Sequence, residues 1–140
     1  MQRDDFGNLE EWGRVLSLVE GLTRDGRLEA QQAGLVRLLR YPDNWRLREA
    51  ALESCRTLRE PTEPLVSAVL RIMMDEGLYH EVRVLAAEAL AQLVPATRRS
   101  SLGRNRALEG QVAEQMHALL DSPHPPVLHQ AARRVLPTVE

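Results

Sequence analysis

The chain has 140 residues and a formal net charge of −2, and 44% of its residues are hydrophobic but only 4% are aromatic. This length fits one domain with an aliphatic core that needs no disulfide or metal, and the small net charge excludes a global attraction to nucleic acid or to a membrane surface. Cys55 is the only cysteine, which excludes an intrachain disulfide and a cysteine-based metal cluster.

The expected location of the protein follows from its first residues and its cysteine content. The chain begins MQRDDFGNLEEW, which is acidic and polar and does not contain the apolar core of a signal peptide. No run approaches the roughly 18 apolar residues that cross a membrane, and a lone cysteine is compatible with a reducing compartment. We therefore expect a cytoplasmic protein without membrane association. All 18 basic residues are arginine, which is typical of a GC-rich bacterial genome.

Hydrophobic residues recur every three or four positions along the whole chain, which predicts amphipathic helices and no strand. Turns rich in Gly, Pro, Asp and Asn separate these stretches. Pro95 is expected to stop the fifth helix, and residues 96–105 are expected to form a polar loop. Seven helices are predicted, in chain order, over about residues 8–23, 27–40, 45–59, 63–75, 81–94, 106–120 and 126–136.

A twelve-residue pattern occurs three times, beginning at Leu47, Val82 and Val127, at intervals of 35 and 45 residues. The longer interval contains the predicted loop. One helix pair per unit of this length is the signature of an α-solenoid, in which each unit packs only on its neighbours. We therefore predict a single domain with an N-terminal capping helix in residues 1–26, repeats over about 27–60, 61–95 and 106–140, and the loop at 96–105.

Superposing the three copies predicts which positions are buried. Small residues recur at two positions of the repeat, where they would let helices approach closely. Cys55 shares a third position with Leu90 and Val135, so it is expected to be a small buried hydrophobe rather than a nucleophile, since its helix also contains no histidine that could act as a base. The small residues are Ala51, Ala86 and Ala131 at one position and Ala87 and Ala132 at the other, where the first copy has Leu52.

The segment Val82–Leu93 resembles the second helix of a HEAT repeat, in the short bacterial form called the PBS-lyase HEAT-like repeat. The first copy matches more loosely, and the third departs from the pattern at Leu128 and Pro137. The resemblance covers about residues 27–139 and implies an all-α, armadillo-like α-α superhelix. In that family the acid of the turn and an arginine of the second helix often link neighbouring units. The resemblance therefore implies this role for Arg48 and Arg83, and implies that the third repeat lacks the link.

The sequence contains no strong signal for a catalytic site or a metal site. His117 and Asp121 are four residues apart, and His124 and His129 follow closely, but their spacing matches no dedicated metal motif, so ordinary surface or turn histidines are expected. Glu53 and Glu88 occupy equivalent repeat positions and could face each other. Paired carboxylates can act as acid and base when one of them is desolvated, but solvent would keep both of these ionised. Phosphate-binding glycine loops, zinc-binding helix motifs and serine elbows do not occur in the sequence. We expect no catalytic residues, no metal and no cofactor.

Four arginines, Arg98, Arg99, Arg104 and Arg106, lie within nine residues in and beside the predicted loop. Such a cluster could bind phosphate, nucleic acid or an acidic peptide. No aromatic residue occurs among them, so base stacking is unsupported. The alternative is a solvated loop without a binding role.

The expected function is that of a non-catalytic interaction module, a scaffold or an adaptor, because solenoids expose an extended surface made from one helix of each repeat. This surface would change from acidic to basic along the stack and would suit a dipolar helix or an extended peptide of a protein partner. Two alternatives are a chromophore-lyase-like enzyme or subunit, from the repeat resemblance, and nucleic-acid binding through the arginine cluster. The predicted binding residues are Glu49, Glu53, Arg56, Val84, Glu88, Gln92, His129 and Arg133.

Overall fold

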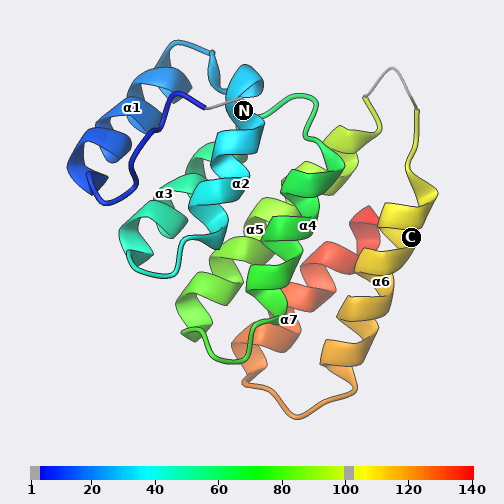
Figure 1. The fold of residues 1–140 in the computed structure, drawn as a ribbon. Helices are drawn as coiled ribbons and strands as arrows, with labels where there is room; N and C mark the ends of the chain where they lie inside the picture. The colour runs from blue at the N-terminus through cyan, green and yellow to red at the C-terminus, as the bar shows by residue number, and fades with distance from the viewer. Residues whose placement is uncertain (1–3, 100–102) are drawn as a thin grey trace.

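The computed structural model describes residues 4–99 and 103–140, and these ranges contain seven α-helices, two short 3-10 helices and no strand (Figure 1). The prediction of an all-helical protein with seven helices is thereby confirmed. In chain order the elements are α1 (Trp12–Arg24), η1 (Leu28–Gln31), α2 (Gln32–Arg40), α3 (Trp45–Cys55), α4 (Glu63–Met74), α5 (His80–Thr97), α6 (Arg106–Leu120), α7 (Pro126–Val135) and η2 (Leu136–Thr138).

Several helix boundaries follow from local sequence chemistry. Asn44 and Asn105 cap α3 and α6, because each side-chain oxygen accepts a hydrogen bond from a first-turn backbone N–H, at 2.9 and 3.0 Å. Pro64 and Pro126 lie in the first turns of α4 and α7, where a missing N–H costs nothing. Gly26, with φ of 69°, makes the turn after α1.

Several predicted boundaries were wrong, including the start of the second helix, where η1 precedes α2. Helix α5 continues through Pro95 to Thr97, because the residues around the proline are buried and their packing offsets the hydrogen bond that proline cannot donate. Helix α3 ends at Cys55 instead of Arg59, and the chain continues in short turns. Helix α1 begins at Trp12, since the Asn8 side chain accepts from the Glu10 N–H and forms a turn before the helix.

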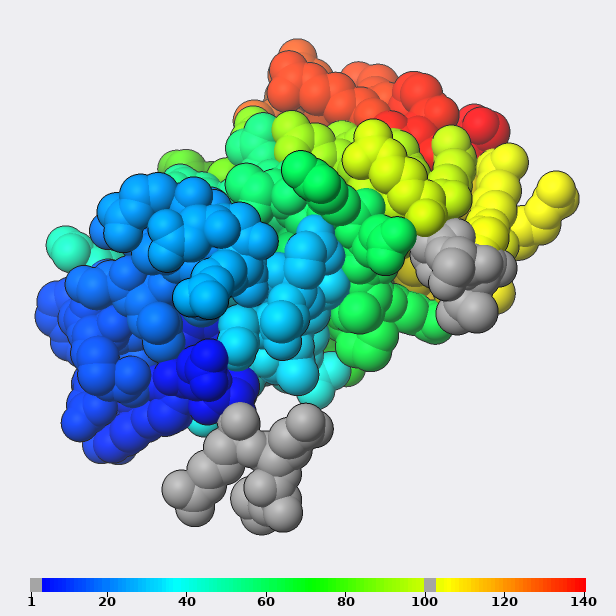
Figure 2. Space-filling model, turned by 90° about the horizontal axis from the view of Figure 1, so that it is seen from above, coloured from blue at the N-terminus to red at the C-terminus, as the bar shows by residue number. Residues whose placement is uncertain are grey.

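The helices form two layers that follow chain order. Helices α2, α4 and α6 lie side by side in one layer, and α1, α3, α5 and α7 lie side by side in the other. Within the described ranges α2 pairs with α3, α4 with α5 and α6 with α7, each across a short turn at the lower side of Figure 1. Seen from above, the chain runs from one end of the molecule to the other without returning (Figure 2).

The core lies between the layers and is almost wholly aliphatic. All nine residues at the three superposed repeat positions, including Cys55, are buried, with at most 3% of any of them exposed. The internal repeat therefore predicted burial correctly, because equivalent positions of successive pairs meet equivalent neighbours. No helix in the described part of the chain is both long and apolar enough to cross a membrane.

Candidate functional site

Four glutamates surround a hollow of about 230 Å³ on the open face of α3 and α5. Glu49 and Glu53 come from α3, and Glu81 and Glu88 come from α5. Positions four and seven residues apart fall on one face of a helix, so each helix presents both of its glutamates to the same space. We call this space the acidic hollow, and its remaining lining residues are Val82, Val84 and Leu85.

A second hollow, of about 170 Å³, begins where the first ends and extends toward α7. Arg56 and Arg134 lie on its rim, and Glu88 belongs to both hollows. We call it the arginine hollow, and its other lining residues are Ala87, Ala91, Gln92 and Ala131. The alanines keep its floor apolar and leave the arginines as its main charges.

Contacts with α5 hold Arg56 at the boundary of the two hollows. Its Nη1 lies 3.7 Å from a carboxylate oxygen of Glu88. With its amide oxygen turned toward Arg56, Gln92 accepts a hydrogen bond from Nη2 at 3.0 Å. Both partners leave the guanidinium partly exposed, so it is positioned and still accessible to a binding partner.

The two hollows bring together six of the eight predicted binding residues, and the other two lie elsewhere. His129 is half-buried, and its Nε2 lies 2.9 Å from the Ser122 carbonyl oxygen, so it closes the turn before α7. Arg133 is exposed, but Arg134 lines the hollow in its place. The repeat superposition pairs Arg134 with the buried Ala89. Helix α7 is the last of its layer, however, and packs on α5 and α6, whereas α5 packs on α3, α4 and α7, so the two positions have different neighbours.

Sequence reasoning also missed Glu81, although a signal for it was present. Glu81 precedes Glu88 by seven residues, which is two helical turns, so the two share a face. The twelve-residue pattern begins at Val82, so Glu81 lies just outside the positions that the repeat superposition compares.

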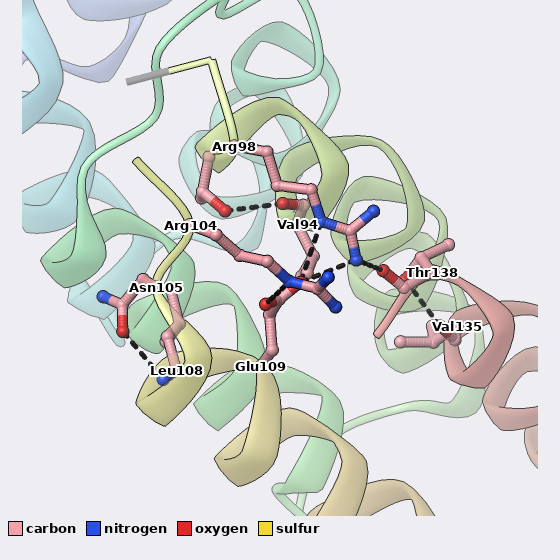
Figure 3. Close-up of polar contacts among 9 residues, drawn as sticks. Val94, Arg98, Arg104, Asn105, Leu108, Glu109, Val135 and Thr138 are labelled. Atoms are coloured by element: carbon pink, nitrogen blue, oxygen red, sulfur yellow. Dashed lines mark hydrogen bonds and ion pairs between the residues drawn. The ribbon is translucent and has the colours of Figure 1, made fainter. Parts of the chain in front are cut away.

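Two members of the arginine cluster bond a buried acid, Glu109, which the sequence analysis did not single out. Glu109, in the first turn of α6, is 3% exposed. Arg98 and Arg104 both bond its carboxylate, each at 2.6 Å, and Arg98 also donates to the Thr138 carbonyl oxygen at 2.6 Å (Figure 3). Arg99 and Arg106 are exposed. The middle of the predicted loop, residues 100–102, lies outside the described residues.

The charge state of Glu109 follows from this arrangement. Burial acts to raise the pKa of its carboxyl group, but the hydrogen bonds and positive charges of Arg104 and Arg98 outweigh burial and lower the pKa below the ordinary value of 4.5. Glu109 is therefore ionised at neutral pH. Its negative charge binds Arg98 and Arg104 and so joins α5, α6 and η2. These two of the four arginines therefore have a structural role.

Arg48 and Arg83, which occupy equivalent repeat positions, bond within their own helix pairs, which corrects the expectation that they link neighbouring pairs. Arg83 donates from Nε to the Met73 carbonyl oxygen at 2.6 Å, and Arg48 donates from Nε to the Leu39 carbonyl oxygen at 3.4 Å. Each acceptor is the residue before the last of the preceding helix. In the third pair His129 makes a similar bond to the turn, although Leu128 replaces the arginine.

The remaining candidates show no catalytic geometry. Within the described part of the chain, no group of three or more His, Cys, Asp or Glu residues could hold a metal ion. His117 lies beside Glu140 at 3.0 Å, and His124 lies 3.5 Å from Glu76. Burial raises the pKa of the Cys55 thiol to about 12, so it is protonated at neutral pH.

Comparison with known proteins identified no relative of this chain. No protein-family model matches the chain, and neither the curated proteins nor the solved structures contain a significant match. The feature that bears on function is the surface of α3, α5 and α7, where two small hollows of different charge adjoin.

Proposed function

We propose that this protein is a non-catalytic interaction module, built as a short HEAT-like α-solenoid of the armadillo-like kind, that binds a protein or peptide on the surface of α3, α5 and α7. The observation that carries the proposal is the adjoining pair of hollows, which gather side chains from the regions of α3, α5 and α7, three helices that are distant in sequence. The helices pack in two layers that follow chain order, which supports the proposed solenoid architecture.

The size of the hollows favours side chains of a macromolecular partner over a small molecule. Ligand pockets typically enclose about 300–1,000 Å³. The hollows here measure about 230 and 170 Å³ and are open to solvent. Each is large enough for one inserted side chain, and two side chains of one bound peptide would fill the adjoining pair.

The charges of the hollows define the partner more closely. A lysine or arginine of the partner would place its charge among the glutamates of the acidic hollow and its aliphatic stem against Val84 and Leu85. An aspartate or glutamate would meet Arg56 and Arg134 in the arginine hollow. A dipolar helix or an extended peptide with both charge signs satisfies the two hollows together.

Selection of peptides against the full chain tests this proposal. We expect enriched peptides to carry both charge signs and to perturb the NMR signals of α3, α5 and α7. Replacing Glu53 and Glu88 with Lys should weaken their binding at least tenfold, since both side chains line the acidic hollow. Glu53 is exposed and Glu88 is half-buried beside Arg56, so thermal unfolding of the variant is measured together with binding to show that it stays folded.

Glu114→Lys, on the exposed side of α6, is the matched control and should leave binding unchanged. If binding ignores Glu53 and Glu88 but is lost when Arg99 and Arg106 are replaced with Ala, the arginine cluster is the site instead. A steep fall of that binding with salt would then indicate a polyanionic partner, because released counterions scale with the phosphates neutralised.

A further inference from the structure

The arginine hollow has its positive charges at the rim and apolar atoms at the floor. Ala87 and Ala131 form the floor and are only 2% and 3% exposed, with the half-buried Ala91 beside them. Arg56 is partly exposed and Arg134 is exposed, so their guanidinium groups lie nearer to solvent than the alanines do. A group that fits this hollow therefore places apolar atoms at its deepest point and a negative charge close to the surface.

The charge balance of the arginine hollow matches one monovalent anion. Its lining residues are two arginines and one glutamate, Glu88, which leaves one net positive charge. The exposed charged residues that flank the lining positions cancel in pairs, Glu53 with Arg133 and Glu60 with Arg59. A carboxylate carries one negative charge, whereas a phosphorylated side chain carries about −1.5 to −2 at pH 7. The balance therefore favours a carboxylate over a phosphate group.

Arg56 keeps hydrogen-bond donors available for such a carboxylate. A guanidinium has five N–H donors, and the contacts with Glu88 at 3.7 Å and Gln92 at 3.0 Å engage only Nη1 and Nη2. Arg134 lines the same hollow from α7. Two arginines that reach one hollow from different helices can each bond an oxygen of the same carboxylate.

A carboxylate in this hollow can come from an acidic side chain or from the free C-terminus of the partner. An aspartate or glutamate carries its charge at the tip of the side chain, so insertion would bring that charge onto the alanine floor. A C-terminal residue carries its carboxylate on Cα, beside its own side chain. Its apolar side chain can therefore cover the alanines while its carboxylate stays level with Arg56 and Arg134.

We propose that the arginine hollow binds the free C-terminal carboxylate of a protein partner whose last residue is small and apolar, and that an upstream basic residue enters the acidic hollow. This inference rests on the proposed function and names the part of the partner that is bound. On α5 the lining residues of the two hollows are centred roughly 8 Å apart. The further step from the α3 side to the α7 side lengthens the path, so the basic residue lies about three or four residues before the C-terminus.

Three fluorescein-labelled peptides test this inference by fluorescence anisotropy with the full chain. The probe is GSGKKSGV with a free carboxyl end. The first control is the same peptide with a C-terminal amide. The second control is GSGKKSDV with a C-terminal amide, which has the net charge of the probe but carries its carboxylate on an internal side chain. We expect the probe to bind at least tenfold more tightly than either control.

Variants of the chain locate the bound carboxylate. Arg134→Gln should weaken the probe at least fivefold and reduce its advantage over the first control to less than twofold. Arg133→Gln is the matched control, since Arg133 is the exposed neighbour outside the hollow, and it should preserve the tenfold advantage. Glu53→Lys should weaken the probe and its amide by the same factor, because it acts on the lysines. Thermal unfolding of each variant is measured alongside binding.

Several results would overturn the inference. Equal affinity for the probe and its amide removes the terminal carboxylate, and equal affinity for the aspartate peptide assigns the hollow to a side chain. An advantage that Arg134→Gln leaves intact places the carboxylate elsewhere. If none of the three peptides binds at millimolar concentration, while selected peptides still bind and require Glu53 and Glu88, this inference is wrong and the proposed function stands. If the selected peptides also fail to bind, the proposed function fails as well.

Discussion

Cys55 lies at the same repeat position as Leu90 and Val135, and all three are fully buried. Its Sγ lies 3.3 Å from the Leu52 carbonyl oxygen, one turn earlier in α3. Burial raises the thiol pKa to about 12 and keeps the reactive thiolate scarce at neutral pH. The cysteine therefore acts as a small hydrophobic residue of the core.

The folded protein should accordingly react slowly with a bulky thiol reagent at pH 7–8, and denaturant should speed the reaction by orders of magnitude. Cys55→Ser should lower the free energy of unfolding by about 1–3 kcal/mol, because a hydroxyl group enters an apolar site. Cys55→Ala is the control without a polar group. Rapid labelling of the native protein would show that the site opens readily, contrary to its burial.

At the scale of elements, α3 and α5 each hold the end of the preceding helix through one arginine. The last carbonyl groups of a helix have no partner within it, and an arginine from α3 or α5 bonds one of them in α2 or α4. The two contacts differ in strength. Arg83 is 2% exposed and bonds at 2.6 Å, whereas Arg48 is half-buried and bonds at 3.4 and 3.3 Å.

Replacing Arg83 with Ala should therefore cost about 3 kcal/mol, from the lost bond and the cavity left by a large buried side chain. Arg48→Ala should cost only about 1 kcal/mol. Urea unfolding of the two variants gives the comparison. Burial lowers the pKa of Arg83, and its Nη2 has no hydrogen-bond partner among the described residues, so its charge is costly. Arg83→Met should recover part of the loss; an equal or larger cost for Arg48→Ala would contradict this ranking.

At the scale of the whole molecule, polar side chains join successive helix pairs that otherwise meet through aliphatic packing. Gln32 accepts from the Thr62 N–H at 2.8 Å and so ties the first pair to the second. Glu109 connects the second pair to the third through Arg98 at the end of α5, and Arg98 also reaches η2. The end of the molecule is thereby fixed by one buried carboxylate.

This connection predicts how stability changes with pH. The pKa of Glu109 is lowered in the folded state, so its contribution is complete above the unfolded value near 4.5 and is lost as pH falls through the folded value. Glu109→Gln should lower the free energy of unfolding by about 2 kcal/mol at pH 7, since hydrogen bonds to charged groups contribute about 1.5–3 kcal/mol. The gap between parent and variant should narrow below about pH 4.5.

Thermal unfolding of both proteins from pH 3 to pH 7 measures this gap. Glu114→Gln, an exposed change on the same helix, should track the parent throughout. A gap that stays constant across this range would mean that the ionised form of Glu109 is not what stabilises the joint.

The sequence by itself determined the helical class, the number of helices and the buried repeat positions, because hydrophobic periodicity and turn residues act locally. It also singled out six residues that line the two hollows, since equivalent repeat positions of α3 and α5 face the same way. Only the tertiary structure decided that Arg134 replaces Arg133, that Glu109 engages Arg98, and that α5 passes through Pro95. These features depend on which neighbour covers a residue, and at the end of the chain and at the joints between pairs that neighbour differs from the one the repeat implies.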